Sequence, residues 1–320
     1  MSILIYAETQ NGSFSKSAFE LASYARALAN EMDTSVTAVA VKPTDPKAIE
    51  LYGVNKVLQV NNPSLTTFNA KSYAEVISQA AQASNSSVVL LSTSADSKFL
   101  APLLAIKLKA SYASNVVALP MSLDPFVVKR TVFTNKAYGM TELSGDRRLI
   151  SLSKNAFGLV EQAVSAEVEV FEPSISESTQ SVTGVDKASD KVTIADAEVV
   201  VSAGRGLKGP ENWGMIETLA EVLGAATACS KPVSDMGWRS HGEHVGQTGK
   251  PVAANLYIAI GISGAIQHLA GINSSKVKVV INTDPEAPFF KAADYGVVGD
   301  AFEVVPALIE KLKVFKSQNS

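Results

Sequence analysis

The sequence predicts an α/β protein built from two doubly wound parallel-sheet domains, and three observations predict it. Short apolar runs alternate with amphipathic helical patterns in both halves of the chain, which is typical of parallel βαβ units. A polar segment near residues 172–195 separates the two series. The length of 320 residues suits two domains, at roughly 150 residues for each.

The first domain is expected over residues 1–190. Its predicted strands lie at 3–6, 36–41, 56–60, 88–92 and 116–119, and its predicted helices at 15–31, 73–83 and 99–108. Apolar residues recur at helical spacing in the first helix, so that one of its faces packs on the sheet. Residues 126–153 lose the helical period and are rich in β-branched and aromatic residues, with a turn signal at 144–146. This stretch predicts an antiparallel hairpin or meander.

Residues 172–195 are rich in Ser, Thr, Asp and Lys and predict a linker without a core of its own. The second domain is expected over residues 196–320. Its predicted strands lie at 198–202, 225–229, 256–260 and 277–281, and its predicted helices at 212–223, from 263 onward and at 304–313.

Composition excludes several classes of protein. With 28 Lys and Arg against 31 Asp and Glu, the formal charge of -3 lacks the basic excess of a nucleic-acid binder. One cysteine, Cys229, forms no internal disulfide, and with three histidines it leaves too few ligands for a structural zinc site. No apolar stretch approaches the roughly 20 residues of a membrane span, and residues 1–7 resemble a strand rather than an export signal. We expect a cytoplasmic protein, without membrane insertion.

A glycine-rich loop follows the first strand of the second domain. Gly204, Gly206 and Gly209 have the spacing of a dinucleotide-binding loop, with Pro210 where the first helical turn would begin. NAD binding also requires an acidic residue at the end of the next strand, where this chain has Ser230 and Lys231. A glycine turn that only caps the helix is the alternative.

Two further segments place polar groups beside glycines. Gly246 and Gly249 flank Gln247 and Thr248 in a tight turn, which is either a ligand loop or an ordinary polar loop. A phosphate loop is excluded, because His244 and Pro251 stand where it needs Gly and Ser or Thr.

After the strand at 256–260, Ser263 and Gly264 lead into a helix, and Ser263 is predicted to be its N-cap. His268 follows in that helix, where a lone histidine is more often a packed or solvated residue than a catalytic one.

Polar residues recur at the predicted strand ends. Because the carboxyl ends of parallel strands form one crevice, a single ligand is expected to gather them: Arg205, Ser230, Lys231, Thr248, Ser263, Asn282 and Asp300. No nucleophile elbow or nucleophile–base motif is present. We therefore expect a binding protein or carrier with no catalytic residues.

Four motifs together resemble the electron transfer flavoprotein α-subunit family. They are the Gly204-Arg-Gly206 loop, Val245-Gly-Gln-Thr-Gly-Lys250, Gly261-Ile-Ser-Gly-Ala-Ile-Gln-His268, and Asn282 with Asp284-Pro-Glu-Ala-Pro288. The match covers most of residues 197–312. The first domain matches more loosely, through Leu4-Ile-Tyr-Ala-Glu8 and Asn11-Gly12.

The resemblance implies an α subunit that forms a heterodimer with a β subunit and binds FAD in a Rossmann-like second domain. It implies electron transfer from flavin dehydrogenases, such as the acyl-CoA dehydrogenases of fatty acid beta-oxidation, to a membrane quinone oxidoreductase, in a bacterial cytoplasm. It implies that Thr248 hydrogen-bonds near flavin N5, His268 near the pyrimidine carbonyl, and Ser263 near the ribityl or phosphate part. The implied FAD-binding residues are Arg205, Ser230, Lys231, Val245, Gly246, Gln247, Thr248, Ser263, Gly264, Ala265, Ile266, Gln267, His268, Asn282 and Asp300.

Two residues depart from the family pattern: Lys231 stands where Arg is usual, and Ala301 where Leu is usual. Lys keeps the positive charge that stabilises a one-electron-reduced flavin but lacks the planar fork of Arg.

Two other functions remain as alternatives. One is an NAD(P)-dependent oxidoreductase that uses the Gly204–Gly206–Gly209 loop. The other is a flavin-free nucleotide-binding regulatory subunit.

Overall fold

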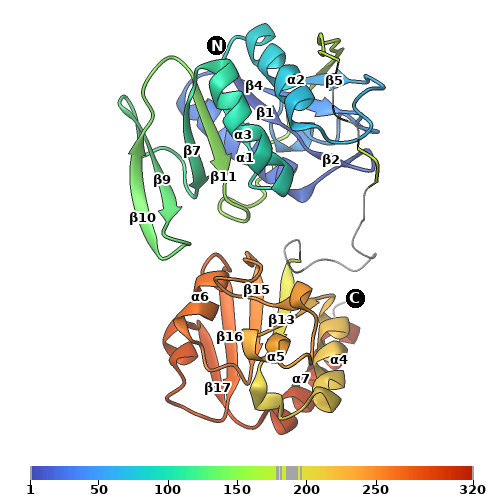
Figure 1. The fold of residues 1–320 in the computed structure, drawn as a ribbon, viewed down its shortest axis with the longest axis vertical. Coiled ribbons are helices and arrows are strands. Elements are labelled where there is room, and N and C mark those ends of the chain that lie inside the picture. The colour runs from blue at the N-terminus through green and yellow to red at the C-terminus, as the bar shows by residue number, and fades with distance from the viewer. Residues whose placement is uncertain (1, 178–179, 181, 185–193, 195–196, 319–320) are drawn as a thin grey trace. The chain divides into compact units, whose positions relative to one another are not determined.

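A computed structural model describes residues 2–177, 180, 182–184, 194 and 197–318. The chain divides into two compact units, the first formed mainly by residues up to 184 and the second mainly by residues 197–318 (Figure 1). Residues 172–177 form no helix or strand. Most of the predicted linker, and the predicted boundary between 190 and 196, lie outside the described residues.

The first unit is a mixed sheet with a parallel centre. Within the described residues its strand order is β10-β9-β7-β11-β6-β1-β4-β5-β12, and β8 pairs with β9. The strands are β1 (Ser2–Tyr6), β4 (Ser35–Val41), β5 (Lys56–Val60), β6 (Ser86–Leu91), β7 (Ser111–Val116), β8 (Ser122–Leu123), β9 (Phe126–Val132), β10 (Ala137–Glu142), β11 (Arg148–Leu152) and β12 (Glu167–Val170). A short hairpin of β2 (Thr9–Gln10) and β3 (Ser13–Phe14) follows β1.

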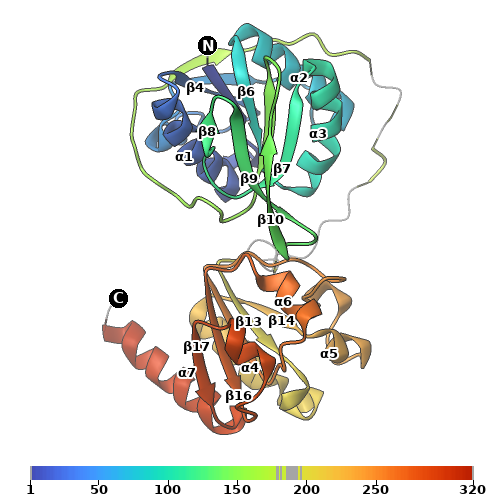
Figure 2. The same ribbon diagram turned by 90° about the vertical axis from the view of Figure 1, so that its left-hand side faces the viewer.

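Helices cover both faces of this sheet, as expected for a doubly wound domain. Helix α1 (Lys16–Glu31) packs on one face, and α2 (Ala70–Ala83) and α3 (Ala95–Leu108) pack on the other, as the edge-on view of Figure 2 shows. A short 3₁₀ helix, η1 (Glu50–Tyr52), precedes β5. Ser15, Asn69 and Ser94 cap the three α-helices with their side chains.

Two details of the first domain differ from the sequence prediction. The strand predicted at 116–119 is instead β7, which ends at Val116. The antiparallel pairs of this stretch are β8 with β9, β9 with β10 and β7 with β9, whereas β11 lies parallel between β6 and β7. The turn signal at 144–146 therefore leads back into the parallel sheet rather than closing a hairpin.

Glu8 joins the carboxyl ends of the two central strands, β1 and β6. Its Oε1 accepts hydrogen bonds from the hydroxyls of Ser92 (2.6 Å), Ser94 (2.8 Å) and Ser97 (2.6 Å). Ser94 is also the N-cap of α3. Burial, and secondly the Glu8 charge, raise the pKa of neighbouring Asp96. The carboxylate thus satisfies the serines that surround the start of α3.

The second unit is a fully parallel sheet, which confirms the predicted fold class. In the described part of the chain its order is β14-β13-β15-β16-β17. The strands are β13 (Val199–Ala203), β14 (Ala226–Cys229), β15 (Leu256–Ile260), β16 (Val277–Asn282) and β17 (Tyr295–Val298). Central β13 and β15 are apolar and nearly fully buried, as strands covered on both faces should be.

Two apolar cores cover the faces of this sheet. Helices α4 (Gly214–Leu223), α5 (Lys231–Asp235) and α7 (Ala301–Gln318) contribute to the core on one face. Residues of α6 (Ile266–Ile272) and of the 3₁₀ helix η5 (Pro288–Ala292) contribute to the core on the other. Shorter 3₁₀ helices are η2 (Arg205–Leu207), η3 (Pro210–Trp213) and η4 (His241–Glu243). The predicted final helix at 304–313 lies within α7.

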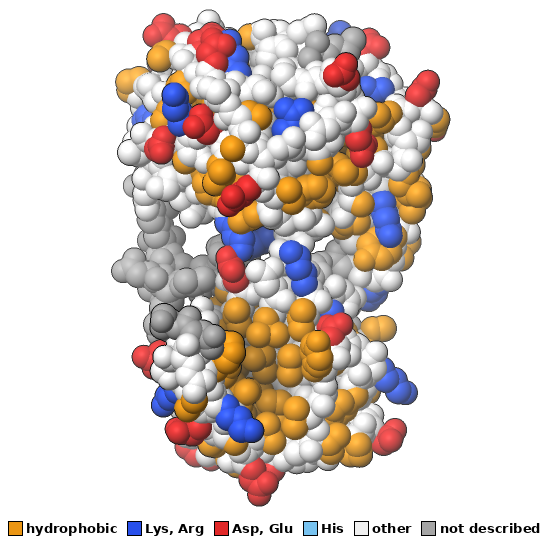
Figure 3. Space-filling model, turned by 180° about the vertical axis from the view of Figure 1, so that it is seen from behind, with side chains coloured by type: hydrophobic (Ala, Val, Ile, Leu, Met, Phe, Trp, Pro, Cys, Tyr) orange, Lys and Arg blue, Asp and Glu red, His pale blue; other side chains and the backbone are white. Residues whose placement is uncertain are grey.

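Several large apolar side chains of the second unit are exposed. They include Tyr295, Val297 and Val298 of β17 and Phe315 of α7, and Figure 3 shows hydrophobic side chains gathered on one face of this unit. None of the described helices is long and apolar enough to cross a membrane.

Candidate cofactor site

The order of strands in the second unit determines where a ligand crevice can lie. β13 is the first strand of the unit and β15 the third, and they are direct neighbours at the centre of the sheet. The connections that leave them lead to helices on opposite faces. Ligands of open α/β sheets bind at such a switch point, outside the carboxyl ends of the strands. The loops that follow β13 and β15 therefore form the candidate site.

Glycines bring the loops after β13 and β15 into direct backbone contact. The amide of Gly204 donates to Ile260 O (2.9 Å), and the amide of Gly206 donates to Gly261 O (3.1 Å). A Cβ on Gly206 would lie 2.6 Å from Gly261 Cα. Gly204 and Gly206 therefore serve loop-to-loop packing, and their amides are already bonded within the protein. That this loop binds the cofactor stays a prediction. The Arg205 side chain is exposed.

The segment after β15 keeps unbonded amides. The backbone N–H groups of Ser263, Gly264 and Ala265 donate to no acceptor among the residues that the structure describes. Gly264 has a φ of +86°, a left-handed conformation that favours glycine. Successive free amides form a ready site for anionic or carbonyl oxygens. Ser263 is not the N-cap, contrary to the prediction, because Ala265 occupies that position and has no capping side chain.

The Val245–Gly249 loop folds against this segment. Val245 donates its amide to Cys229 O (3.0 Å), and the Gln247 amide donates to Gln267 O (2.7 Å). The side chains of Gln247 and Thr248 are exposed. Two of the predicted site segments, 245–248 and 263–268, are therefore brought together.

His268 is a buried residue with one ring nitrogen unpaired. Its side chain is 7% exposed, and Nε2 forms a hydrogen bond of 2.9 Å with the hydroxyl of fully buried Tyr257. Nδ1 has no hydrogen-bond partner within the described chain. Burial, and secondly the neighbouring His244, lower the pKa of His268 to about 4, so the imidazole is neutral at pH 7.

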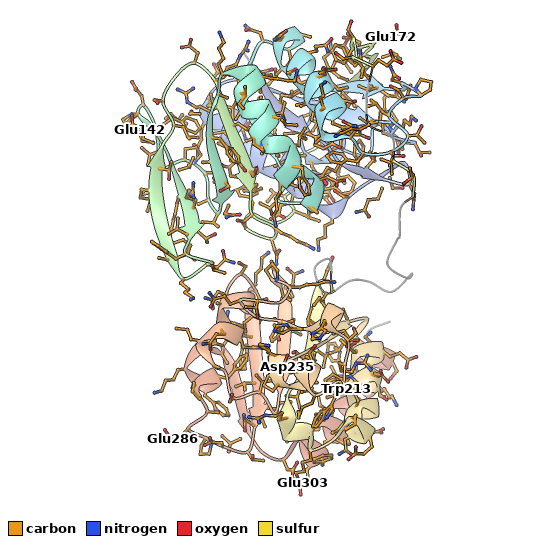
Figure 4. The ribbon with its side chains drawn as sticks, in the orientation of Figure 1. Glu142, Glu172, Trp213, Asp235, Glu286 and Glu303 are labelled. Atoms are coloured by element: carbon orange, nitrogen blue, oxygen red, sulfur yellow. The ribbon has the colours of Figure 1, made fainter. Side chains whose placement is uncertain are left out.

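Lys231 lies at the start of α5, directly after the strand end at Ser230. Its Nζ forms an exposed ion pair with Asp235 (2.9 Å), the α5 residue labelled in Figure 4. This pair lowers the pKa of Asp235. Ser230 is buried, and its amide donates to Ala203 O (3.1 Å), so this strand end is tied to β13.

Asn282 and Asp300 hold neighbouring loops in place. Asn282 Nδ2 donates to Ile262 O (3.1 Å), which ties the end of β16 to the segment with free amides. Asp300 Oδ1 accepts the Phe302 amide (3.0 Å) at the start of α7, and its Oδ2 lies 3.7 Å from Lys208 Nζ. Both residues therefore stabilise the loops through hydrogen bonds, and the side-chain atoms named here already have partners within the protein.

Sequence reasoning missed two buried groups beside the loops, Tyr257 and His244. Tyr257 lies in a continuously apolar strand, and nothing in that pattern indicates that its hydroxyl contacts His268. Burial, and secondly the charge of Lys231, lower the pKa of His244, which is 7% exposed. No cluster of metal-ligating side chains occurs in the described residues.

The contact between the loops predicts a large penalty for a side chain at Gly261. Gly261 has φ +61° and faces Gly206 Cα, whereas Gly224, with φ +64°, has open space where its Cβ would be. Gly224→Ala should cost about 1–2 kcal/mol of unfolding free energy from backbone strain alone. Gly261→Ala should cost a further 1–3 kcal/mol or so from overpacking. Equal losses in urea denaturation would show that the contact is easily relaxed.

The buried neutral His268 predicts that acid destabilises the second unit. The pKa of His268 in the folded protein, about 4, lies below the usual value of about 6.5. The unfolded chain therefore binds a proton first as the pH falls, so the free energy of unfolding is highest above about pH 6.5 and decreases as the pH approaches 4. The loss should reach roughly 3 kcal/mol. Fluorescence of the two tryptophans, Trp213 and Trp238, follows urea unfolding of this unit. His268→Asn should lessen the loss between pH 6.5 and 5, and identical slopes in both proteins would contradict this prediction.

Comparison with known proteins agrees with this architecture. Residues 3–176 match the electron transfer flavoprotein domain, and residues 193–273 match the electron transfer flavoprotein FAD-binding domain. The chain is 35% identical over 328 residues to the electron transfer flavoprotein subunit alpha of Thermoanaerobacterium thermosaccharolyticum, covering 98% of each chain. It is 35% identical over 317 residues to the protein of the same name from Bacillus subtilis, covering 97% of each.

The likeness extends over 98% and 97% of these two relatives and includes both units. It confirms the family inferred from the sequence motifs, and FAD is the cofactor of the matched second domain. The chain belongs to the electron transfer flavoprotein α-subunit family.

Proposed function

We propose that this chain is the α subunit of a heterodimeric electron carrier. It holds FAD in its second unit, accepts electrons from flavin dehydrogenases such as acyl-CoA dehydrogenases, and delivers them to a membrane quinone oxidoreductase. The observation that carries the proposal is the row of free amides at Ser263, Gly264 and Ala265, within the segment that matches the FAD-binding domain. Bacterial relatives support a bacterial cytoplasm as its location.

The polar groups of the site fit FAD. Free amides at residues 263–265 suit the diphosphate or the ribityl oxygens, because unpaired N–H groups bind anionic and hydroxyl oxygens. The exposed Gln247 and Thr248 side chains offer donors to the ring, with the Thr248 hydroxyl assigned to flavin N5. The unpaired Nδ1 of His268 offers one more. Bound FAD supplies the one- and two-electron chemistry.

The remaining predicted residues are proposed to complete the site from its edges. Val245, Gly246, Ile266 and Gln267 would shape it through the loop and the first turn of α6. Ser230 and Lys231 would border it from α5, and Asn282 and Asp300 would orient its loops. Arg205 is exposed and available to a phosphate.

A carrier without substrate chemistry fits the remaining groups. Burial, and secondly the Glu243 charge, raise the pKa of the Cys229 thiol to about 12, so it is not a nucleophile at neutral pH. The alternative of an NAD(P)-dependent oxidoreductase has little support, because the Gly204 and Gly206 amides that would bind a diphosphate donate to Ile260 and Gly261.

The first domain, residues 1–190, is proposed to pack on the β subunit, with FAD confined to the domain at 196–320. Exposed apolar side chains on α3 support this division. Phe99 is 70% exposed and Ile106 is 78% exposed, which is unusual for large apolar residues of one helix.

Co-expression with a β subunit tests the function directly. The pair should purify as a yellow one-to-one complex that releases FAD on denaturation, and an acyl-CoA dehydrogenase with its substrate should bleach the colour. This chain alone should be pale or aggregated. A colourless pair, or a bound pyridine nucleotide, would refute the proposal.

The ion pair of Lys231 and Asp235 predicts that substitutions of its two members shift the flavin reduction potential in opposite directions. Lys231→Ala should lower the first reduction potential by tens of millivolts, because a nearby positive charge favours the reduced anionic ring. Lys231→Arg should preserve the potential. Asp235→Asn should raise it, because Asp235 partly neutralises Lys231. Dithionite titration of the complex measures each value, and potentials equal to the parent in all three would make Lys231 a solvated surface charge.

A further inference from the structure

His244 is a buried histidine whose ring forms no hydrogen bond. The residue is 7% exposed, and neither imidazole nitrogen bonds to another described residue. Both nitrogens are partly exposed, in contrast to Nδ1 of His268, which is fully enclosed and unpaired. Most buried polar side chains have a hydrogen-bond partner, because a buried group without one costs free energy. The ring of His244 therefore suits a role that needs an accessible nitrogen.

Two glycines make room for this ring. A Cβ on Gly249 would lie 2.9 Å from Cγ of His244, and a Cβ on Gly246 would lie 3.5 Å from its Nε2. These glycines flank Gln247 and Thr248, whose side chains are exposed and are proposed to meet the flavin ring. The imidazole therefore lies against both ends of a turn that belongs to the proposed FAD site.

Titratable groups of several elements surround His244. Burial lowers its pKa most, and the charge of Lys231 lowers it further, against the opposing charge of Asp235. Glu243 precedes it in the chain, but Arg239 binds that carboxylate through two hydrogen bonds of 2.9 Å. The imidazole is therefore neutral at pH 7. The titratable residues around it are Cys229 on β14, Lys231 and Asp235 on α5, His241 and Glu243 on η4, Lys250 after the loop, and His268 on α6.

His244 is the group of this set whose charge can change with the state of the site. Lys231 is a cation already. His268 has Nε2 bonded to the Tyr257 hydroxyl and Nδ1 enclosed, so a second proton has no route to its ring. His241 is exposed, so water screens its charge from the site. A histidine with accessible nitrogens and an ordinary pKa near 6.5 gains a proton close to neutral pH when its surroundings become more negative.

Reduction of bound FAD adds a negative charge to the proposed site. A nearby negative charge stabilises an imidazolium and raises its pKa, which opposes the effects of burial and of Lys231. Attraction between opposite charges is also stronger where bulk water is excluded. The change in flavin charge therefore acts on the protonation of His244.

We propose that His244 is a redox-linked proton acceptor, which is neutral beside oxidised FAD and takes up one proton from water at a ring nitrogen when one electron enters the flavin ring. The electron comes from the donor flavin dehydrogenase, and the bond that forms is the N–H bond of the imidazolium. Reoxidation of the flavin returns the proton to water. This rests on the proposed function, because the electron enters FAD.

Nuclear magnetic resonance of the complex with its β subunit tests the proton uptake. With ¹⁵N-labelled histidine, His244→Gln and His241→Gln variants assign the two signals. In the oxidised complex His244 should be neutral at pH 7. After full reduction with dithionite its pKa should rise by about 1 or more. The pKa of exposed His241 should change much less, because water screens it.

The pH dependence of the first reduction potential is a second measurement. One proton taken up with one electron lowers the potential by up to about 59 mV for each tenfold fall in proton concentration. His244→Gln, or His244→Asn if the first variant does not fold, should have a smaller slope than the parent. His241→Gln is the matched control from the same 3₁₀ helix and should keep the parent slope.

Each outcome decides one claim. If His244 stays neutral in the reduced parent complex, or if its substitution leaves the slope unchanged, the proton uptake is overturned. If His241→Gln loses the slope equally, the assignment to His244 is overturned. A complex that binds no FAD contradicts the proposed function and the proton uptake with it, whereas a yellow complex in which His244 does not titrate contradicts the proton uptake alone.

Discussion

The close approach of two backbone segments at Gly206 and Gly261 organises the second unit. Buried backbone groups at the ends of β13 and β15 require hydrogen-bond partners. Here the amides of Gly204 and Gly206 bond to the end of β15, so these two donors of the loop after β13 are paired within the protein. The three successive amides of residues 263–265 have no acceptor among the described residues, so this segment offers a row of donors to a ligand.

Two polar residues of the predicted site, Asn282 and Asp300, stabilise loops within the protein. Asn282 ties β16 to Ile262, and Asp300 starts α7 while it faces Lys208. Such bonds hold the loops in place, and rigid loops lose less conformational entropy when a ligand binds. Support for a site can therefore come from residues whose polar atoms are already paired.

The sequence predicted the fold class and most elements, because apolar periodicity is a local signal that burial on a parallel sheet enforces. It failed where distant segments decide the outcome. The apolar run at 149–150 predicts a strand but not whether that strand is parallel or antiparallel to its neighbours. Its parallel direction follows from its place between β6 and β7 in the sheet. The glycine spacing after β13 was visible, but whether its amides face a ligand or Gly261 depends on a loop about 55 residues later. Serine is a preferred N-cap residue, but Gly264 has a left-handed conformation and α6 begins only at Ile266, after Ala265 as its N-cap.

The Glu8 carboxylate gives the first unit a built-in substitute for a ligand. It lies at the carboxyl ends of the central strands β1 and β6, where three serines and the beginning of α3 would otherwise suit an anion from solution. A phosphate that approached this point would meet a like charge and find its hydrogen-bond donors already taken. The two domains of similar architecture thus differ at the same end of the sheet: in the first, the Glu8 carboxylate occupies the hydrogen-bond donors, and in the second, the amides of residues 263–265 have no acceptor among the described residues.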